Sequence, residues 1–336
     1  VIGALVAGRF TIPESRDPSA RRLDPIGAGL SVVGLAALLY AVTEGPERGW
    51  ADPVVVACFG LAIVGFVTFV GWERRADTPM LDLGFFRDPR FSAAVVAVMA
   101  LFFAMFGLMF VSTQVLQSVL DHDPLAAGVR LLPLPAMVLV FSQISIRVAA
   151  RAGTRAVVTA GLVITASGLA AGATIDADSG YGVLAVALTL TGIGMGSTMA
   201  PAVESLMSTV PPARAGVASA VNDTTRLSAA AIGVAVVGSL VSSSYRTSLT
   251  DVAGLLTTEQ LDQARTSLAG AVSVAAQLDA PAASQLVATA RQGFVEGASI
   301  GLAIGATVAA LGAFVAWRFL PAKARRPSFG EDGGVV

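Results

Sequence analysis

The chain has 336 residues, of which 54% are hydrophobic and 13% are charged, against about 25% charged residues in an ordinary soluble domain. Its mean hydropathy of +0.74 would leave too much apolar surface exposed in a water-soluble fold. The net charge is −1, and the single cysteine, Cys58, and single histidine, His122, exclude an internal disulfide framework, a cysteine or histidine-cluster metal site and a histidine-dependent triad.

Eight apolar stretches, each of about twenty residues, are long enough to cross a hydrocarbon layer of about 30 Å as helices. The sequence therefore predicts an all-α membrane protein, a polytopic helical bundle with eight complete spans. These spans lie at residues 24–44, 52–72, 93–116, 126–147, 155–175, 181–207, 216–243 and 295–319.

The first residues, Val1–Arg9, resemble the last turns of an apolar helix and are too short to span. We interpret 1–9 as the end of a truncated helix and 10–23 as a cytoplasmic linker. The pair of spans in 24–72 follows, with Asp24 as a helix N-cap and Pro25 at the first helical position.

Residues 73–92 mix apolar and charged side chains, so we expect either an interfacial segment lying along the membrane or a linker held by a few apolar residues. Six spans then occupy 93–320. They include a hydrophilic outer loop at 245–293 that has helix-permissive stretches, and a cytoplasmic tail follows at 321–336.

Positive charge is distributed unevenly over the two sides that this topology defines. One side carries sixteen arginines and lysines and the other carries four, while Arg130 and Arg226 lie inside predicted helices. Cytoplasmic loops are rich in arginine and lysine, so the crowded side is expected to be cytoplasmic, in a plasma membrane. The crowded set is Arg9, Arg16, Arg21, Arg22, Arg74, Arg75, Arg87, Arg90, Arg147, Arg151, Arg155, Arg214, Arg318, Lys323, Arg325 and Arg326, and the opposite set is Arg48, Arg246, Arg265 and Arg291.

The span at 181–207 carries glycines at alternate positions, Gly192, Gly194 and Gly196, followed by Pro201. Small residues let helices approach closely, and a proline removes one backbone hydrogen bond. We expect packing and bending here in preference to substrate contact.

Ionisable side chains within spans are costly, so each is a functional candidate. Glu204 and Asp223 lie about eight and eleven residues from the hairpin at Pro211-Pro212, which puts them at similar depths on adjacent antiparallel helices. Arg226 is the i+3 neighbour of Asp223. A buried carboxylate beside an arginine can exchange a proton as its surroundings change. The alternative is a structural ion pair that joins two helices.

Four amide side chains within or beside spans are candidates for lining a substrate cavity, with hydrogen bonding between helices as the alternative. These are Gln114, Gln117, Gln143 and Asn222.

Several phrases, in this order, resemble the C-terminal part of the fourteen-helix drug:proton antiporters of the major facilitator superfamily. They are ESRDPSARRLDPIGAGL, YAVTEGPERGW, WERRADTPMLDLGFFRDPRFS, LQSVLDHDPLAAGVRLLP and GIGMGSTMAPAVESLMSTVPPARAGVASAVNDTTR. The resemblance implies that Val1–Arg9 ends the sixth helix, that 24–72 holds two additional central helices, and that 93–320 forms the second six-helix half. The missing N-terminal half would then be a partner from the same protein.

The sequence departs from the family pattern at two places. The cytoplasmic gating loop keeps Arg147, Arg151, Gly153 and Arg155, but Ile146 and Ala150 replace the family's glycine and aspartate. After Asn-Asp-Thr-x-Arg, the family's Gln-x-Gly-Gly is replaced by Leu-Ser-Ala-Ala. Because Ala150 replaces the aspartate of the cytoplasmic gating loop, a charge relay through that loop is not expected.

The resemblance implies a secondary active transporter that exports drug-like amphipathic or cationic small molecules against proton entry. Its partners would be the small-molecule substrate, protons and the lipid bilayer. We expect no cofactor, no metal, no nucleic acid and no enzyme activity. The alternative is a non-transporting membrane sensor or scaffold with a transporter-like half.

Overall fold

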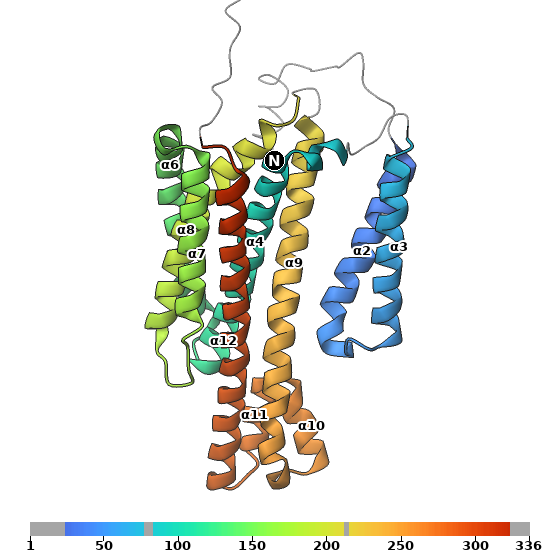
Figure 1. Ribbon diagram of the computed structural model, residues 1–336. Helices are drawn as coiled ribbons and strands as arrows, with labels where there is room; N and C mark the ends of the chain where they lie inside the picture. Colours follow the sequence, from blue (N-terminus) through green and yellow to red (C-terminus); the bar gives the residue numbers. More distant parts are fainter. Residues whose placement is uncertain (1–23, 77–82, 212–214, 323–336) are drawn as a thin grey trace, which may run out of the picture.

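The computed structural model describes residues 24–76, 83–211 and 215–322, and every regular element in these ranges is helical. Eight helical stretches are long and apolar enough to cross a membrane. They run roughly parallel to one another (Figure 1). The expected all-α fold with eight spans is confirmed, whereas Val1–Arg9, the linker 10–23 and most of the C-terminal tail lie outside the described residues.

Helices α2 (Pro25–Arg48) and α3 (Pro53–Glu73) form a hairpin at one side of the bundle (Figure 1). An aspartate followed by proline starts each helix. Asp24 accepts a hydrogen bond from the Gly27 amide, and Asp52 accepts one from the Val54 amide. The two helices approach closely because a Cβ on Gly65 would lie 2.9 Å from the Cα of Gly34. Small residues therefore set the spacing within the hairpin.

Two tryptophans fix the ends of this hairpin. The Trp72 indole N–H donates to the Asp24 carboxylate at 2.9 Å, which ties the end of α3 to the start of α2. The Trp50 indole N–H donates to the Ser239 hydroxyl at 3.1 Å. Ser239 belongs to α9, so this bond connects the hairpin to the rest of the bundle.

Helix α4 (Pro89–Gln114) is the most enclosed of the spanning helices. In its apolar window 61% of residues are buried, against 22% in α3. A short 3-10 turn, η1 (Leu83–Arg87), precedes α4, and the Phe86 ring packs edge-on against the Phe91 ring. Of the segment 73–92, residues 77–82 are outside the described ranges, but the part next to α4 packs by aromatic contact.

One π-helical turn, η2 (Val115–Val119), continues α4 at its C-terminal end. The chain then turns at Asp121, which has a positive φ of 52°, and enters α5 (Pro124–Leu131). The predicted span at 126–147 is two helices, because α6 (Pro133–Ala152) begins at a new proline. Pro133 supplies no backbone N–H, so the helix cannot continue through it unchanged.

A single residue, Gly153, separates α6 from α7 (Thr154–Gly172). Its φ of 88° lies in the left-handed region that favours glycine. The predicted cytoplasmic loop is therefore one residue long. Arg147 and Arg151 belong to α6, and Arg155 belongs to the first turn of α7.

The alternate glycines of α8 (Tyr181–Met207) point to two different neighbours. A Cβ on Gly192 would lie 2.5 Å from the carbonyl oxygen of Leu134 in α6, and one on Gly196 would lie 2.8 Å from that of Val138. A Cβ on Gly194 would instead meet Gly161 and Thr165 of α7. Pro201 is buried within the same helix. The glycine face of α8 thus allows both α6 and α7 to pack against it at once.

Two helices extend well past the expected spans. Helix α9 (Ala215–Ser248) has 34 residues and α12 (Ala280–Phe319) has 40, so they are about 50 and 60 Å long. Between them lie η4 (Leu249–Leu255), α10 (Thr258–Thr266) and α11 (Leu268–Ala275). Figure 1 shows α10 and α11 beside the lower parts of α9 and α12, at the bottom of the bundle. Much of the predicted outer loop is therefore helical.

Side-chain contacts stabilise the end of the bundle that α10 and α11 form. The Tyr245 hydroxyl donates to the carbonyl oxygen of Ala264 at 2.7 Å and lies 2.9 Å from that of Ser267. A Cβ on Gly297 would lie 2.6 Å from the Cα of Val241, so α9 and α12 are in close contact there. Arg291 forms an ion pair with Asp121 at 2.6 Å. That pair attaches α12 to the turn that follows α4.

Candidate functional site

Two of the charged residues of α9, Asp223 and Arg226, line a cavity between α9 and α4. The cavity has a volume of about 300 Å³. Positions 223, 226, 227 and 230 recur at helical spacing, so they share one face of α9, and two phenylalanines one turn apart on α4 oppose them. The lining residues are Phe102, Phe106, Asp223, Arg226, Leu227 and Ala230.

Arg226 lies between a carboxylate and an aromatic ring. Its Nη1 is 3.5 Å from Asp223 Oδ1, and its Cζ is 4.7 Å from the centroid of the Phe102 ring. A guanidinium over an aromatic face is attracted by the negative potential of that face. The Arg226 side chain is 35% exposed and the Asp223 side chain 60% exposed. The guanidinium is therefore held by the ring, and the carboxylate is accessible from the cavity.

The cavity walls are fixed by a tight helix contact next to them. A Cβ on Gly233 would lie 2.5 Å from the carbonyl oxygen of Phe103, and one on Gly107 would lie 3.0 Å from a methyl group of Val237. Helices α4 and α9 therefore touch backbone to backbone one turn beyond Ala230. The Phe102 and Phe106 rings are stacked with centroids 6.3 Å apart. Together these contacts keep the aromatic wall opposite Arg226.

The structure joins Asp223 with Arg226 but does not bring Glu204 into contact with them. Glu204 is exposed on α8, and within the described ranges its carboxylate has no ion pair. Asp223 is also exposed, so the two carboxylates do not form the buried cluster that the sequence suggested. Helix counting from the hairpin gave a similar depth for both, but the direction in which each side chain points depends on how its helix is rotated.

The amide candidates are dispersed. Gln114, Gln117 and Gln143 are exposed, on α4, η2 and α6, and none of them lines the cavity. Asn222 is buried at 7% exposure, and its Oδ1 has no hydrogen-bond partner among the described residues. A buried acceptor without a hydrogen-bond partner is unfavourable. Asn222 is therefore the one of these four amides at which a hydrogen-bond donor is missing from the described part of the chain.

The aromatic wall was not foreseen from the sequence. Phe102 and Phe106 have the i, i+4 spacing of one helix face. In an apolar span, however, such a phenylalanine pair normally indicates a side-chain packing contact and not the wall of a cavity. Both are at least 120 residues from Arg226 in the sequence, so their position opposite Arg226 depends on how α4 and α9 pack. In the described part of the chain, no group of three histidine, cysteine or carboxylate side chains is arranged to bind a metal ion.

Comparison with known proteins identifies the class of protein. Residues 25–234, more than half of the chain, match the family model of the Major Facilitator Superfamily. The chain therefore belongs to the major facilitator superfamily, and with its eight candidate spans it is a multi-pass membrane protein.

Its relatives include bacterial resistance proteins. The chain is 36% identical over 230 residues to the multidrug resistance protein Stp of Mycobacterium tuberculosis, a match that covers 68% of this chain and 43% of that protein. It is 31% identical over 293 residues to the multidrug efflux pump LfrA of Mycolicibacterium smegmatis, covering 87% and 58%. It is 30% identical over 243 residues to the tetracenomycin C resistance and export protein of Streptomyces glaucescens, covering 72% and 45%. These matches span about half the length of each relative.

Proposed function

We propose that the natural protein containing this chain is a secondary transporter of the drug:proton antiporter branch of the superfamily, which exports amphipathic cations. Three relatives are named for multidrug resistance, multidrug efflux, or the resistance to and export of one drug. The observation that carries the proposal for this chain is the α4–α9 cavity, where an accessible carboxylate faces two stacked aromatic rings.

The lining of the cavity suits an amphipathic cation. Apolar and aromatic surfaces of Phe102, Phe106, Leu227 and Ala230 can cover a hydrophobic body. The Asp223 carboxylate can neutralise one positive charge, and the faces of the phenylalanine rings add cation–π attraction. Arg226 repels cations on its own side of the Asp223 carboxylate, so the substrate charge approaches Asp223 from the side away from the guanidinium.

Proton coupling follows from competition at Asp223. A proton and an organic cation are each attracted by the same carboxylate, so binding of one weakens binding of the other. Exchange of the two across the membrane then yields export driven by proton entry. Arg226 stays charged throughout, because the guanidinium retains its proton in proteins.

The transport cycle in this proposal is a rocking motion of two helical halves about a midplane site. The six spans between the start of α4 and the end of α12 form one half. Helices α2 and α3 are accessory helices. A second half with six spans is the partner. The arginine-rich end of the bundle faces the cytoplasm of a bacterial plasma membrane. Glu204 lies near that end of α8 and is a second candidate for carrying protons.

The test uses the purified natural protein in proteoliposomes that contain a pH-sensitive dye. Asp223→Asn keeps shape and hydrogen bonding but has no titratable proton. We expect this variant to insert normally and to lose most of the proton flux that a lipophilic cation such as ethidium evokes in the unchanged protein. Glu204→Gln is made in parallel.

Normal cation-evoked proton flux in both neutral variants would rule out coupling through these carboxylates. Absence of ethidium transport and of ethidium binding in the unchanged protein would instead favour the sensor or scaffold function.

A further inference from the structure

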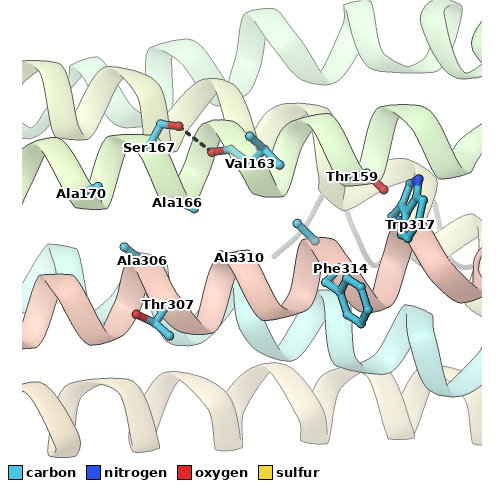
Figure 2. A pocket seen from close by; sticks show the side chains of 11 residues that line it. Thr159, Val163, Ala166, Ser167, Ala170, Ala306, Thr307, Ala310, Phe314 and Trp317 are labelled. Atoms are coloured by element: carbon cyan, nitrogen blue, oxygen red, sulfur yellow. Dashed lines mark hydrogen bonds between the residues drawn. The ribbon is translucent and has the colours of Figure 1, made fainter.

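A second hollow lies on the surface of the bundle, away from the α4–α9 cavity. It is an open groove of about 590 Å³ between α7 and α12. Figure 2 shows Thr159 and Trp317 at one end of it and Ala170 and Ala306 at the other. The middle of the groove is lined by small residues, among them Ala166 and Ala310.

The length of the groove matches one leaflet of a bilayer. On α7 its lining runs from Thr159 to Ala170, and on α12 it runs from Ala306 to Trp317. Each wall covers eleven residue steps, or about 16 Å of helix. Half of a hydrocarbon layer of about 30 Å is about 15 Å. An extended acyl chain in one leaflet would therefore occupy the groove from end to end.

The end of the groove at Trp317 is strongly basic. Arg155 stands one turn before Thr159 on the same face of α7, and its Cζ lies 5.3 Å from the centroid of the Trp317 ring. Its backbone N–H donates to the carbonyl oxygen of Pro321, which ties the start of α7 to the end of α12. Within the described residues the Arg155 guanidinium has no ion pair, so its N–H donors are available to an anion.

The helices that form this end of the groove carry basic residues and no acidic ones. Helices α6 and α7 and the part of α12 after Glu296 contain no aspartate or glutamate, whereas Arg147, Arg151, Arg155 and Arg318 all lie at the same end. Four cations on helix segments without a carboxylate attract an anionic headgroup at the membrane surface.

One hydroxyl at this end also lacks a partner. Among the groove's hydroxyls, Ser167 donates to the carbonyl oxygen of Val163 and Thr307 to that of Ala303, both at 2.9 Å. The Thr159 hydroxyl is enclosed and forms no hydrogen bond within the described ranges. A buried polar group without a partner is unfavourable. A headgroup or ester oxygen entering between Arg155 and Trp317 would supply an acceptor.

We propose that the α7–α12 groove is a binding site for one anionic phospholipid. The acyl chain lies against Val163, Ala166 and Ala310, and the phosphate is bound by Arg155 with Trp317 at the level of the headgroup. This site is separate from the α4–α9 cavity, so it does not depend on what the protein transports.

The test is native mass spectrometry of the purified natural protein, titrated with dioleoyl phosphatidylglycerol or dioleoyl phosphatidylcholine. The unchanged protein should retain phosphatidylglycerol in preference to phosphatidylcholine. Arg155→Gln should lower that preference about fivefold, as expected for one cation near a lipid phosphate, and Arg155→Lys should keep most of it. Arg90→Gln removes one positive charge from α4 at the same end of the bundle and is the matched control, expected to have little effect.

A second pair of variants tests the groove itself. Ala310→Leu fills it and should reduce retention of both lipids, whereas Ala160→Leu adds the same volume to an exposed position of α7 outside the groove and should not. Equal retention of the two lipids by the unchanged protein, or equal losses in the Arg155 and Arg90 variants, would overturn the proposal. A dimer that Ala310→Leu dissociates would also overturn it, because a second copy would then cover the groove.

Discussion

At the scale of single residues, Arg226 contacts a carboxylate on its own helix, α9, and an aromatic ring on α4. Its contact with Asp223 follows from the i, i+3 spacing on one helix, and the structure contains it. Its contact with Phe102 could not be derived, because it depends on the rotation of α4 and α9 about their axes. For the same reason, Glu204 has a predictable depth but not a predictable neighbour.

We predict a measurable energetic coupling between Arg226 and Phe102. In a double-mutant cycle of Arg226→Gln and Phe102→Leu, the coupling energy should be about 0.5–1 kcal/mol, the range for a partly exposed cation–π contact. The measurement is thermal or denaturant unfolding of the purified natural protein. Phe106→Leu with Arg226→Gln is the control cycle and should give less than half of that value. Equal coupling in the two cycles would mean that the ring of Phe102 has no special relation to the guanidinium.

At the scale of helices, the hydropathy pattern located the spans but not all of the helix ends. Seven helical spans begin within four residues of the predicted position, but α12 begins at Ala280 instead of residue 295. Hydropathy indicates where a helix enters the hydrocarbon layer. Helices α9 and α12 continue beyond that layer through polar residues such as Ser244 and Gln292. The break at Pro133 was visible in the sequence as a proline within an apolar run, yet tolerated prolines in membrane helices make such a break uncertain to predict.

Helix contact at Gly233 should be intolerant of a single added methyl group. Gly233→Ala places a Cβ against the Phe103 carbonyl, which cannot move without shifting α4, so we expect destabilisation of about 1–3 kcal/mol. Gly238→Ala on the same helix meets only the Phe110 ring at 3.5 Å and should be neutral or stabilising by up to about 1 kcal/mol through helix propensity. Midpoints of thermal unfolding for the two variants provide the comparison. A Gly233→Ala protein as stable as the Gly238→Ala protein would show that α4 and α9 are farther apart than described.

At the scale of the whole molecule, the bundle has one arginine-rich end and one end built from α10 and α11. The arginine count indicates which end is cytoplasmic, and α12 ends at the former while beginning at the latter. The orientation in the membrane determines the direction of transport in the proposed cycle. It can be measured without knowing the substrate.

We predict opposite labelling of two single cysteines in intact cells. After Cys58→Ser, the exposed position in Ser284→Cys should react with a membrane-impermeant maleimide in intact cells. The exposed position in Arg87→Cys should react only after the cells are permeabilised. The reverse pattern would contradict the orientation drawn from the arginines and reverse the inferred direction of transport.

Because α12 is long, a small tilt of this helix moves its far end by a large distance. A straight rod of about 60 Å that tilts by about 10° at one end moves its other end by about 10 Å. The ion pair between Arg291 and Asp121 joins α12 to the turn after η2, so we expect a tilt of the bundle to move α12 as well. A fluorophore pair with one member on α11 would therefore magnify small rotations among the membrane helices into displacements large enough to follow in single molecules.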